Sequence, residues 1–297
     1  MGRKTVTADL KPYFFMLPTI LLILFVYLVP FFYSIYISMT DWNGISKEMN
    51  FIGLQNFLNI FKEQTLLEVL GNTLVYFVEI VIVQNVVSLA TALLLNKKFK
   101  GQNFFRATMF LPTVVCTVAV GFIWSLMFDP VNGPVPALFK LLHLKPLQEI
   151  IWLGNTRTAI HAVSFVNIWQ WAGWSMIIYF AGLQSIDRSL YEACDIDGAG
   201  GFQKFVSITM PMLAPSFTVN IVMASIGSLK IFDLPFILTS GGPGHASESL
   251  SISIYSNSFL LNKMGYGTAI SLVLFLFTLV ISIIQTKYLR NNEDNLG

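Results

Sequence analysis

Six long stretches of the chain are apolar and almost free of charge. A helix that spans the hydrocarbon core of a membrane needs about 20 mostly apolar residues, because each residue adds about 1.5 Å of length. The stretches lie near Tyr13–Met39, Gly71–Leu95, Ala107–Phe128, Ala159–Leu183, Met212–Phe232 and Gly265–Thr286. The pattern predicts an all-α integral membrane protein with six transmembrane helices.

The composition supports a membrane location. Of the 297 residues, 55% are hydrophobic and only 11% are charged, whereas a soluble globular domain carries about 25% charged residues. A soluble protein of this size could not bury so much apolar surface, so the bilayer is the expected solvent. A formal net charge of +2 gives no indication of a nucleic-acid partner.

The positions of lysine and arginine orient the helices, because cytoplasmic loops of membrane proteins are enriched in both residues. With the N-terminus inside, the cytoplasmic segments hold Arg3, Lys4, Lys11, Lys97, Lys98, Lys100, Arg106, Arg188, Lys204, Lys287 and Arg290. The outer loops hold fewer: Lys47, Lys62, Lys140, Lys145, Arg157 and Lys263. We therefore expect both termini in the cytoplasm.

The first apolar stretch is expected to remain in the membrane. The apolar region of a signal peptide is about 7–15 residues long, and the uncharged run from Pro12 to Thr40 is longer and is followed by no Ala-x-Ala site. A multi-pass protein in the plasma (inner) membrane of a prokaryote fits this pattern. Cys116 and Cys194 fall in the membrane and the cytoplasm, so we expect no disulfide between them.

The outer loops carry some structure of their own. The segment Phe51–Phe57 is expected to form a short amphipathic helix on the outer surface. The loop Thr239–Lys263 begins with two glycines, a proline and a further glycine at 241–244, which predicts a turn.

The cytoplasmic loop 187–211 predicts two short amphipathic helices. The first would begin at Ser189 and end near Asp197, since Gly198 readily takes the positive φ that ends a helix. The second would carry Phe205 and Ile208 and stop at Pro211. Such a loop either rests on the membrane surface or docks on another protein.

The residues of this loop favour docking, because they resemble the EAA loop of ABC importer permeases. The similar positions are Glu192, Ala193, Cys194, Asp197, Gly198, Phe205, Ile208 and Pro211, with Cys194 where the family usually has alanine. The segments Ile168–Gly173 and Phe110–Pro112 are also similar to sugar permeases of this family. Phe232-Asp233, followed by Thr239 and the Gly-Gly-Pro at 241–243, is similar to the first permease subunit of maltose-type importers.

The resemblance implies a fold, a function and a set of partners. It implies a type I ABC importer permease fold, with an N-terminal transmembrane helix and outer segment in 1–66 and the permease domain in 67–290. The partners would be a homologous second permease, two ATPase subunits, an extracytoplasmic solute-binding protein and a sugar substrate. Glu192 would cap or pair at the docking surface, Ala193 and Cys194 would allow close approach, and Gly198 would make the turn.

The chain is not expected to hydrolyse ATP or to bind a cofactor itself. A phosphate-binding loop needs Gly-x4-Gly-Lys-Ser/Thr, and 198–204 does not fit that pattern. ATP and Mg²⁺ would therefore bind to the partner ATPase, and this chain is expected to be a transport subunit and not an enzyme.

Polar residues within the six stretches are candidates for the solute pathway, because ionisable and polar groups are costly inside a membrane. The candidates are Glu79, Gln84, Asn85, Asn167, Gln170, Trp171, Asn220, Lys230 and Asp233. Asn85 and Asn220 could instead bond neighbouring helices. Lys230 and Asp233 could form an ion pair on a helix surface, and Glu79 could pair with the partner subunit.

Rival functions are less consistent with the sequence. An ion-coupled secondary transporter would show inverted repeats and several midplane carboxylates, and only Glu79 lies that deep. An intramembrane zinc protease would need His-Glu-x-x-His, but the histidines are scattered at 143, 161 and 245. A polyol or glycerol-phosphate permease stays an alternative, although a phosphate ester favours arginine and none lies within the six stretches.

Overall fold

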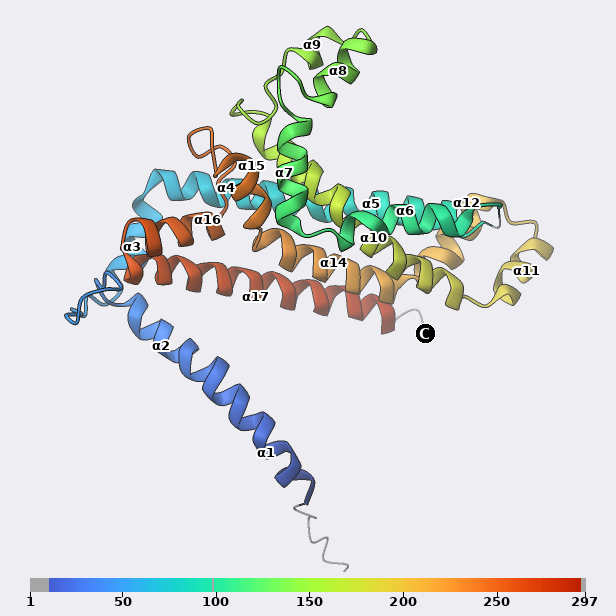
Figure 1. Ribbon diagram of the computed structural model, residues 1–297. Coiled ribbons are helices and arrows are strands. Elements are labelled where there is room, and N and C mark those ends of the chain that lie inside the picture. Colours follow the sequence, from blue (N-terminus) through green and yellow to red (C-terminus); the bar gives the residue numbers. More distant parts are fainter. Residues whose placement is uncertain (1–10, 98, 295–297) are drawn as a thin grey trace, which may run out of the picture.

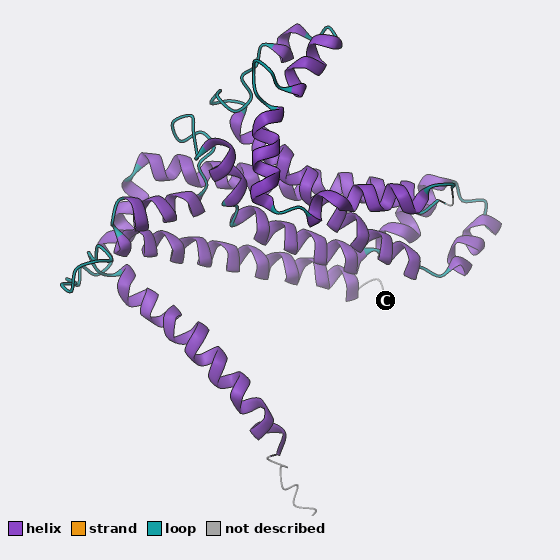
Figure 2. Cartoon of the chain, in the orientation of Figure 1, coloured by secondary structure: helices purple, strands orange, loops and turns teal. Residues whose placement is uncertain are grey.

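The computed structural model describes residues 11–97 and 99–294. Arg3, Lys4 and Lys98, which contribute to the predicted orientation, lie outside these residues. Within the described ranges all regular structure is helical, and the only β contact is an isolated bridge between Thr40 and Phe51. Figure 2 shows long helices joined by short loops. The expectation of an all-α protein is confirmed.

The long helices lie side by side in one bundle (Figure 1). These are α4 (Gln64–Glu79), α5 (Asn85–Leu95), α6 (Gln102–Val114), α10 (Ala159–Ser185), α14 (Ala214–Leu229) and α17 (Met264–Asp294). A π-helical segment, η2 (Ile80–Gln84), joins α4 to α5 without a break in the helical path. The helix α10 contacts α5, α6 and α14, and α14 also contacts α17. The bundle therefore has α10 near its centre.

The N-terminal helix leaves this bundle at one end (Figure 1). It consists of α1 (Lys11–Ile23), the π segment η1 (Leu24–Leu28) and α2 (Val29–Ser38). Its last part contacts α17. None of the most apolar window within Phe15–Ser38 is buried by the chain itself. This helix therefore depends on lipid or on another subunit to cover its surface.

Among the described residues, three continuous helices are long and apolar enough to cross a membrane: Phe15–Ser38, Gln64–Leu95 and Met264–Arg290. Two bent helix pairs, in 102–127 and in 201–229, would raise the number to five if each pair forms one span. The fourth predicted crossing is α10, a helix of 27 residues. It is more polar than the others because side chains such as Asn167 and Gln170 lie within it, and neighbouring helices cover it.

The third predicted crossing, Ala107–Phe128, is not one straight helix. It is split into α6 and α7 (Thr117–Met127), which meet at an angle of 100°. Val115 is extended, with φ −75° and ψ 134°, and Pro112 lies within the last turn of α6, where it cannot donate a backbone hydrogen bond. The apolar run conceals this break, because apolar residues continue on both sides of it.

The fifth predicted crossing, Met212–Phe232, is also bent. The run α12 (Gly201–Lys204), η3 (Phe205–Thr209) and α13 (Met210–Met212) meets α14 at 67°. The helical run ends at Met212, one residue after the stop predicted at Pro211. The bend follows Met212, at the fully buried Leu213.

The outer segments contain short helices. α3 (Gln55–Lys62) begins four residues after the start of the amphipathic segment predicted at Phe51–Phe57. α8 (Pro134–Leu141) and α9 (Lys145–Gln148) project from the bundle beyond α7 (Figure 1). The predicted turn at 241–244 is present, with positive φ at Gly241 and Gly244 and a cis peptide bond between Gly242 and Pro243.

The remainder of the predicted outer loop Thr239–Lys263 is not irregular. It folds into α16 (Leu250–Tyr255) and the π segment η4 (Ser256–Leu260). A further short helix, α15 (Asp233–Thr239), precedes the turn. The fifth predicted crossing ends at Phe232, and no helix was predicted for this last segment.

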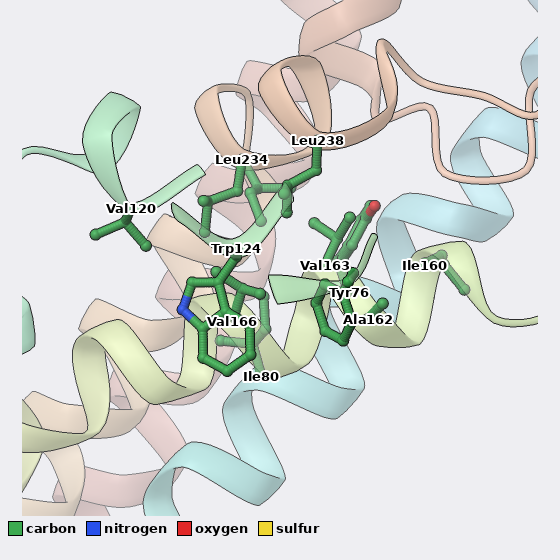
Figure 3. Close-up of a cluster of buried hydrophobic side chains, with 12 residues drawn as sticks. Tyr76, Ile80, Val120, Trp124, Ile160, Ala162, Val163, Val166, Leu234 and Leu238 are labelled. Carbon is green, nitrogen blue, oxygen red and sulfur yellow. The ribbon is translucent and has the colours of Figure 1, made fainter. Parts of the chain in front are cut away.

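Three clusters of buried apolar side chains hold these elements together. The first joins α4, α7, α10 and α15 through residues that include Tyr76, Trp124, Val163 and Leu234 (Figure 3). The second, which includes Tyr179 and Leu213, joins α5, α10 and the bend before α14. The third joins α3, α4, α16 and α17. The first cluster reaches the pocket described below, because Ile80, Ile231 and Leu234 also line that pocket.

Candidate functional site

A pocket of about 420 Å³ lies between α10, α14, the start of α7 and the start of α15. Many of the residues predicted for a solute pathway line it: Gln84, Asn167, Trp171, Lys230 and Asp233. They come from four different helices or connections, so only the folded bundle brings them together. Ile80 and Leu234, which also line it, belong to the first apolar cluster (Figure 3).

One face of α10 supplies the aromatic wall of this pocket. Asn167, Trp171 and Trp174 are four and three residues apart, so they lie along the same face of the helix. Trp171 is 38% exposed and Trp174 is 44% exposed. Trp174 was missed by the sequence analysis, although its helical spacing from Trp171 could have indicated it.

The rest of the lining includes polar and charged groups. Gln84 donates a hydrogen bond of 2.8 Å from Nε2 to the hydroxyl of Ser175, and both side chains are buried. Lys230 and Asp233 are exposed at the mouth of the pocket. They do not form the predicted ion pair, because Lys230 caps the end of α14 while Asp233 begins α15 after a turn. Both charges are therefore available to a ligand.

Gln170 is predicted for the pathway, but its amide is used within the protein. Its Nε2 donates to the carbonyl of Val115 at 3.1 Å and to the hydroxyl of Thr117 at 3.2 Å. The hydroxyl of Thr113 donates to the carbonyl of Gln170 at 2.8 Å. These bonds tie α10 to both sides of the break between α6 and α7. We infer that Gln170 stabilises the break and does not face the pocket.

Asn85 and Asn220 also join helices, which is the alternative that the sequence left open for them. The hydroxyl of Tyr179 on α10 donates to Oδ1 of Asn85 at 2.6 Å. Asn220 on α14 donates from Nδ2 to the carbonyl of Ser175 on α10 at 3.2 Å. Both asparagines are buried. Neither lines the pocket.

Glu79 lies in a different groove, of about 800 Å³, between α4, α6 and α10. Its carboxylate pairs with Nδ1 of His161 on α10. The rest of this groove is mostly apolar and includes Phe165 and Trp169. Glu79 therefore has a partner in its own chain, on the side of α10 away from the aromatic pocket wall.

The loop 187–211 forms two arms at the end of the bundle opposite α3 (Figure 1). The first arm is α11 (Arg188–Ile196), which is capped by Asp187 and not by Ser189, since the Asp187 carboxylate accepts a 2.9 Å bond from the Ser189 N–H. This bond lowers the pKa of the Asp187 carboxyl. Gly198 ends the arm with φ +73° as predicted.

The two arms of the loop are tied together at their base and open at their tip. The hydroxyls of Tyr191 and Thr209 lie 2.9 Å apart, and Lys204 pairs with Asp195. At the tip, Ile196 is 88% exposed and Phe202 is 81% exposed. Large apolar side chains so exposed indicate a contact surface.

The residues singled out in the loop divide between its base and its open face. Ile208 is buried and Cys194 packs against the second apolar cluster. Glu192, Ala193 and Asp197 are exposed. Phe205 and Pro211 are partly buried. Cys116 and Cys194 are both free thiols.

Comparison with known proteins decides the family. The model of the family described as binding-protein-dependent transport system inner membrane component matches residues 84–291. The chain belongs to this family. These permeases are transport subunits of ABC transporters, and the chain is accordingly a multi-pass membrane protein.

Several curated permeases are similar over nearly their whole length. The probable ABC transporter permease YurN of Bacillus subtilis is 35% identical over 285 residues, which cover 95% of this chain and 97% of YurN. The multiple sugar-binding transport system permease MsmF of Streptococcus mutans is 35% identical over 94% of this chain and 95% of its own. The trehalose/maltose permease MalF of Thermococcus litoralis is 31% identical over 95% and 94%.

A solved permease shares the fold. In the crystal structure of a bacterial alginate ABC transporter in complex with an alginate pentasaccharide-bound periplasmic protein, one chain is 22% identical and has a TM-score of 0.83. The match covers 96% of each chain. The type I permease fold that the loop residues imply is thus confirmed at the level of architecture.

Proposed function

We propose that this permease is one of two transmembrane subunits of an ATP-driven sugar importer and forms half of the solute pathway. The observation that carries the proposal is the pocket lined by two tryptophans of α10 together with amide and charged groups. Tryptophan faces cover the apolar faces of a sugar ring, while amides, Lys230 and Asp233 can bond its hydroxyls. The sugar-transport names of several relatives support the same substrate class.

A phosphorylated polyol is a weaker candidate for this pocket. Arginine is the side chain best suited to bind a phosphate, because its guanidinium group can donate two parallel hydrogen bonds to the phosphate oxygens. No arginine lines the pocket within the described residues, and Lys230 is its one basic group. An uncharged sugar therefore fits the lining better than a glycerol phosphate.

The loop 187–211 is proposed as the contact with a separate ATPase subunit. Its exposed tip residues Ile196 and Phe202 need a protein cover, and Glu192 is free to pair across such a contact. ATP and Mg²⁺ would bind to two ATPase subunits, and closure of these subunits would move the loop as a rigid body. A second permease and an extracytoplasmic binding protein complete the proposed assembly.

The proposed orientation places both termini and the loop 187–211 in the cytoplasm, with six crossings of a prokaryotic plasma membrane. In this arrangement, the bent pairs α6–α7 and α12–α14 provide two crossings, and α10 provides another. The polar character of α10 is acceptable because its neighbours, and not lipid, surround much of it. The basic segment 96–106 then lies inside, as the distribution of lysine and arginine favours.

The substrate proposal is tested by uptake into proteoliposomes that contain the chain with its partner permease, ATPase and binding protein. Trp171→Ala should raise the sugar concentration needed for half-maximal uptake, because it removes a stacking surface. Trp169→Ala is the matched control, since Trp169 lies on the same helix with 41% exposure but lines the other groove. If Trp171→Ala and Trp169→Ala raise the sugar concentration for half-maximal uptake equally, the proposal that the pocket binds the sugar is contradicted.

The coupling proposal needs a separate pair of variants. Gly198→Asp forces a side chain onto φ +73°, whereas Gly200→Ala adds a methyl group in open space at φ −69°. Gly198→Asp should abolish sugar-stimulated ATP hydrolysis while the protein still inserts, and Gly200→Ala should not. Sugar uptake that follows an ion gradient and needs no ATPase would contradict the importer proposal and indicate a secondary transporter.

A further inference from the structure

A second polar pocket lies at the end of the bundle near the loop 187–211. It measures about 680 Å³ and sits between the end of α5, the start of α6, the end of α10 and the start of α11. Its polar lining consists of Asn96, Gln102, Asn103, Arg106, Gln184, Arg188 and Tyr191. It shares no lining residue with the aromatic pocket or with the groove that holds Glu79.

This pocket is positively charged, and none of its lining residues within 11–97 and 99–294 is acidic. Arg106 and Arg188 are its two ionisable groups of fixed charge, and neither forms an ion pair with any described carboxylate. The nearest acidic residue in sequence, Asp187, is engaged in capping α11. Two arginines so close to each other without a counter-charge favour an anionic ligand.

Arg106 is held in place but incompletely satisfied. Its guanidinium lies over the ring of Phe180, with Cζ 3.8 Å from the ring centroid. Its Nε is buried and has no hydrogen-bond partner. A buried donor without an acceptor is costly, so an acceptor supplied by a ligand would stabilise this arrangement. Stacking on Phe180 also orients the planar group before the ligand arrives.

The remaining donors suit a phosphate. The amides of Gln102, Asn103 and Gln184 can each donate an N–H, and α6 begins at Gln102 immediately after Gly101. The N-terminus of a helix adds a partial positive charge next to the two arginines. Arginine binds phosphate oxygens in pairs, which a single lysine cannot do.

The surroundings of the pocket point to a lipid as the source of the phosphate. Phe99, Phe104 and Phe105 lie in the same segment and are 43%, 71% and 51% exposed. The ring of Phe105 lies 5.9 Å from that of Phe99 and 6.0 Å from that of Phe104. Exposed aromatic rings next to Lys97 and Lys100 are typical of a surface at the boundary between anionic head groups and acyl chains.

We propose that the pocket between α5, α6, α10 and α11 binds the phosphate of an anionic phospholipid, with Arg106 and Arg188 as its two charged ligands. The location of this lipid in the cytoplasmic leaflet rests on the orientation proposed above. A phosphate held by Arg106 of α6 and Arg188 of α11 links the transmembrane bundle to the first arm of the loop 187–211. Lipid composition would in this way influence how firmly the loop is positioned.

Binding is tested first, on the full-length chain together with the subunits that co-purify with it. Phosphatidylglycerol and phosphatidylcholine are titrated into the detergent-purified protein, and bound lipid is counted by native mass spectrometry. Wild type should prefer phosphatidylglycerol, and Arg106→Gln with Arg188→Gln should weaken its binding roughly a hundredfold, as the loss of two charge-assisted bonds predicts. Arg157→Gln is the control, because Arg157 is exposed in the segment between α9 and α10 and lines none of these pockets.

Each outcome distinguishes a source of the phosphate. Glycerol 3-phosphate is added as a soluble competitor: if it displaces the lipid at similar concentrations, or binds alone through Arg106, the lipid assignment is overturned. Equal phosphatidylglycerol binding by wild type and the double variant overturns the site itself. Arg106→Lys is the control for misfolding, because it keeps the positive charge. It should fold and bind phosphatidylglycerol with an affinity between those of wild type and the double variant.

The lipid proposal can fail independently of the importer proposal. Lipid binding is read without sugar, binding protein or ATP, so a failure of sugar uptake does not change it. A second readout follows once binding is established: in vesicles with phosphatidylglycerol, stimulated ATP hydrolysis should exceed that in phosphatidylcholine alone for wild type. The double variant should lose this difference while Arg157→Gln retains it.

Discussion

Gly173 lies where α10 makes its closest approach to α6. A Cβ atom at this position would lie 2.0 Å from the carbonyl oxygen of Met109 and 2.9 Å from Cα of Phe110. Carbon and carbonyl oxygen approach to about 3.3 Å at closest, so Gly173→Ala would force α6 away by roughly 1.3 Å. The obstructing atoms are backbone and cannot rotate aside. Overpacking costs about 1–3 kcal/mol, and we expect the upper end.

The matched control is Gly71→Ala. Gly71 is an exposed glycine in α4, and an added Cβ there meets nothing within 4 Å. Alanine has the higher helix propensity, so this control should be neutral or stabilised by up to about 1 kcal/mol. In detergent, the apparent melting temperature of Gly173→Ala should fall by roughly 6–12 °C, measured as the monodisperse fraction after heating. If the melting temperature of Gly173→Ala is equal to or above that of Gly71→Ala, the close approach of α10 to α6 is refuted.

Three further changes test particular contacts. Gln170→Leu removes both hydrogen bonds across the α6–α7 break and should lower the stability by about 1–3 kcal/mol. Maleimide should then label Cys116 faster than in wild type, and an unchanged labelling rate would contradict the role of Gln170. Asp187→Ala removes the α11 cap and should lower stimulated ATPase activity, while Asp187→Asn should retain it. The pKa of the Asp187 carboxyl is lowered, so the ionised cap is fully present above about pH 4 and is lost only as the pH falls further. The loss of ATPase activity in Asp187→Ala should therefore be the same at every pH between about 6 and 8. Tyr179→Phe loses the bond to Asn85 and should destabilise by about 1 kcal/mol without an effect on sugar affinity.

The loop 187–211 was largely predictable because its structure depends on local chemistry. Glycine at 198 takes a positive φ that other residues avoid, and the two apolar faces follow helical spacing. The first helix was expected to begin at Ser189 and begins at Arg188 with Asp187 as its cap, since serine and aspartate both occur often at helix starts. The second run ends at Met212, one residue after the stop expected at Pro211.

The break between α6 and α7 could not be read from the local sequence. The run Ala107–Phe128 is apolar throughout, so its hydropathy has no minimum at Val115. The bend depends on Gln170, whose amide bonds Val115 and Thr117 from a helix far along the chain. Contacts of this kind exist only after α10 and α6 have packed. Gly173, one turn further along α10, shows the same dependence.

The aromatic pocket was predicted in part. Polarity within a membrane identified Asn167 and Trp171 correctly as lining residues, but it also selected Gln170, whose side chain points to the α6–α7 break. These residues lie on one helix, and only the arrangement of its neighbours decides which face is open. Because α10 is buried on several sides, no amphipathic pattern was available to separate them.

The π-helical segment η2, between α4 and α5, has a consequence for the evolution of this chain. A π turn accommodates one residue more than a regular helical turn. Deleting one residue from Ile80–Gln84 would therefore turn the π segment into regular helix, and Tyr76 and Asn85 could still both face the core. Deleting a residue elsewhere in α4 or α5 would instead rotate one half of the helix by about 100° relative to the other. The length of this helix is therefore free to change by one residue at η2 and not along the rest of its path.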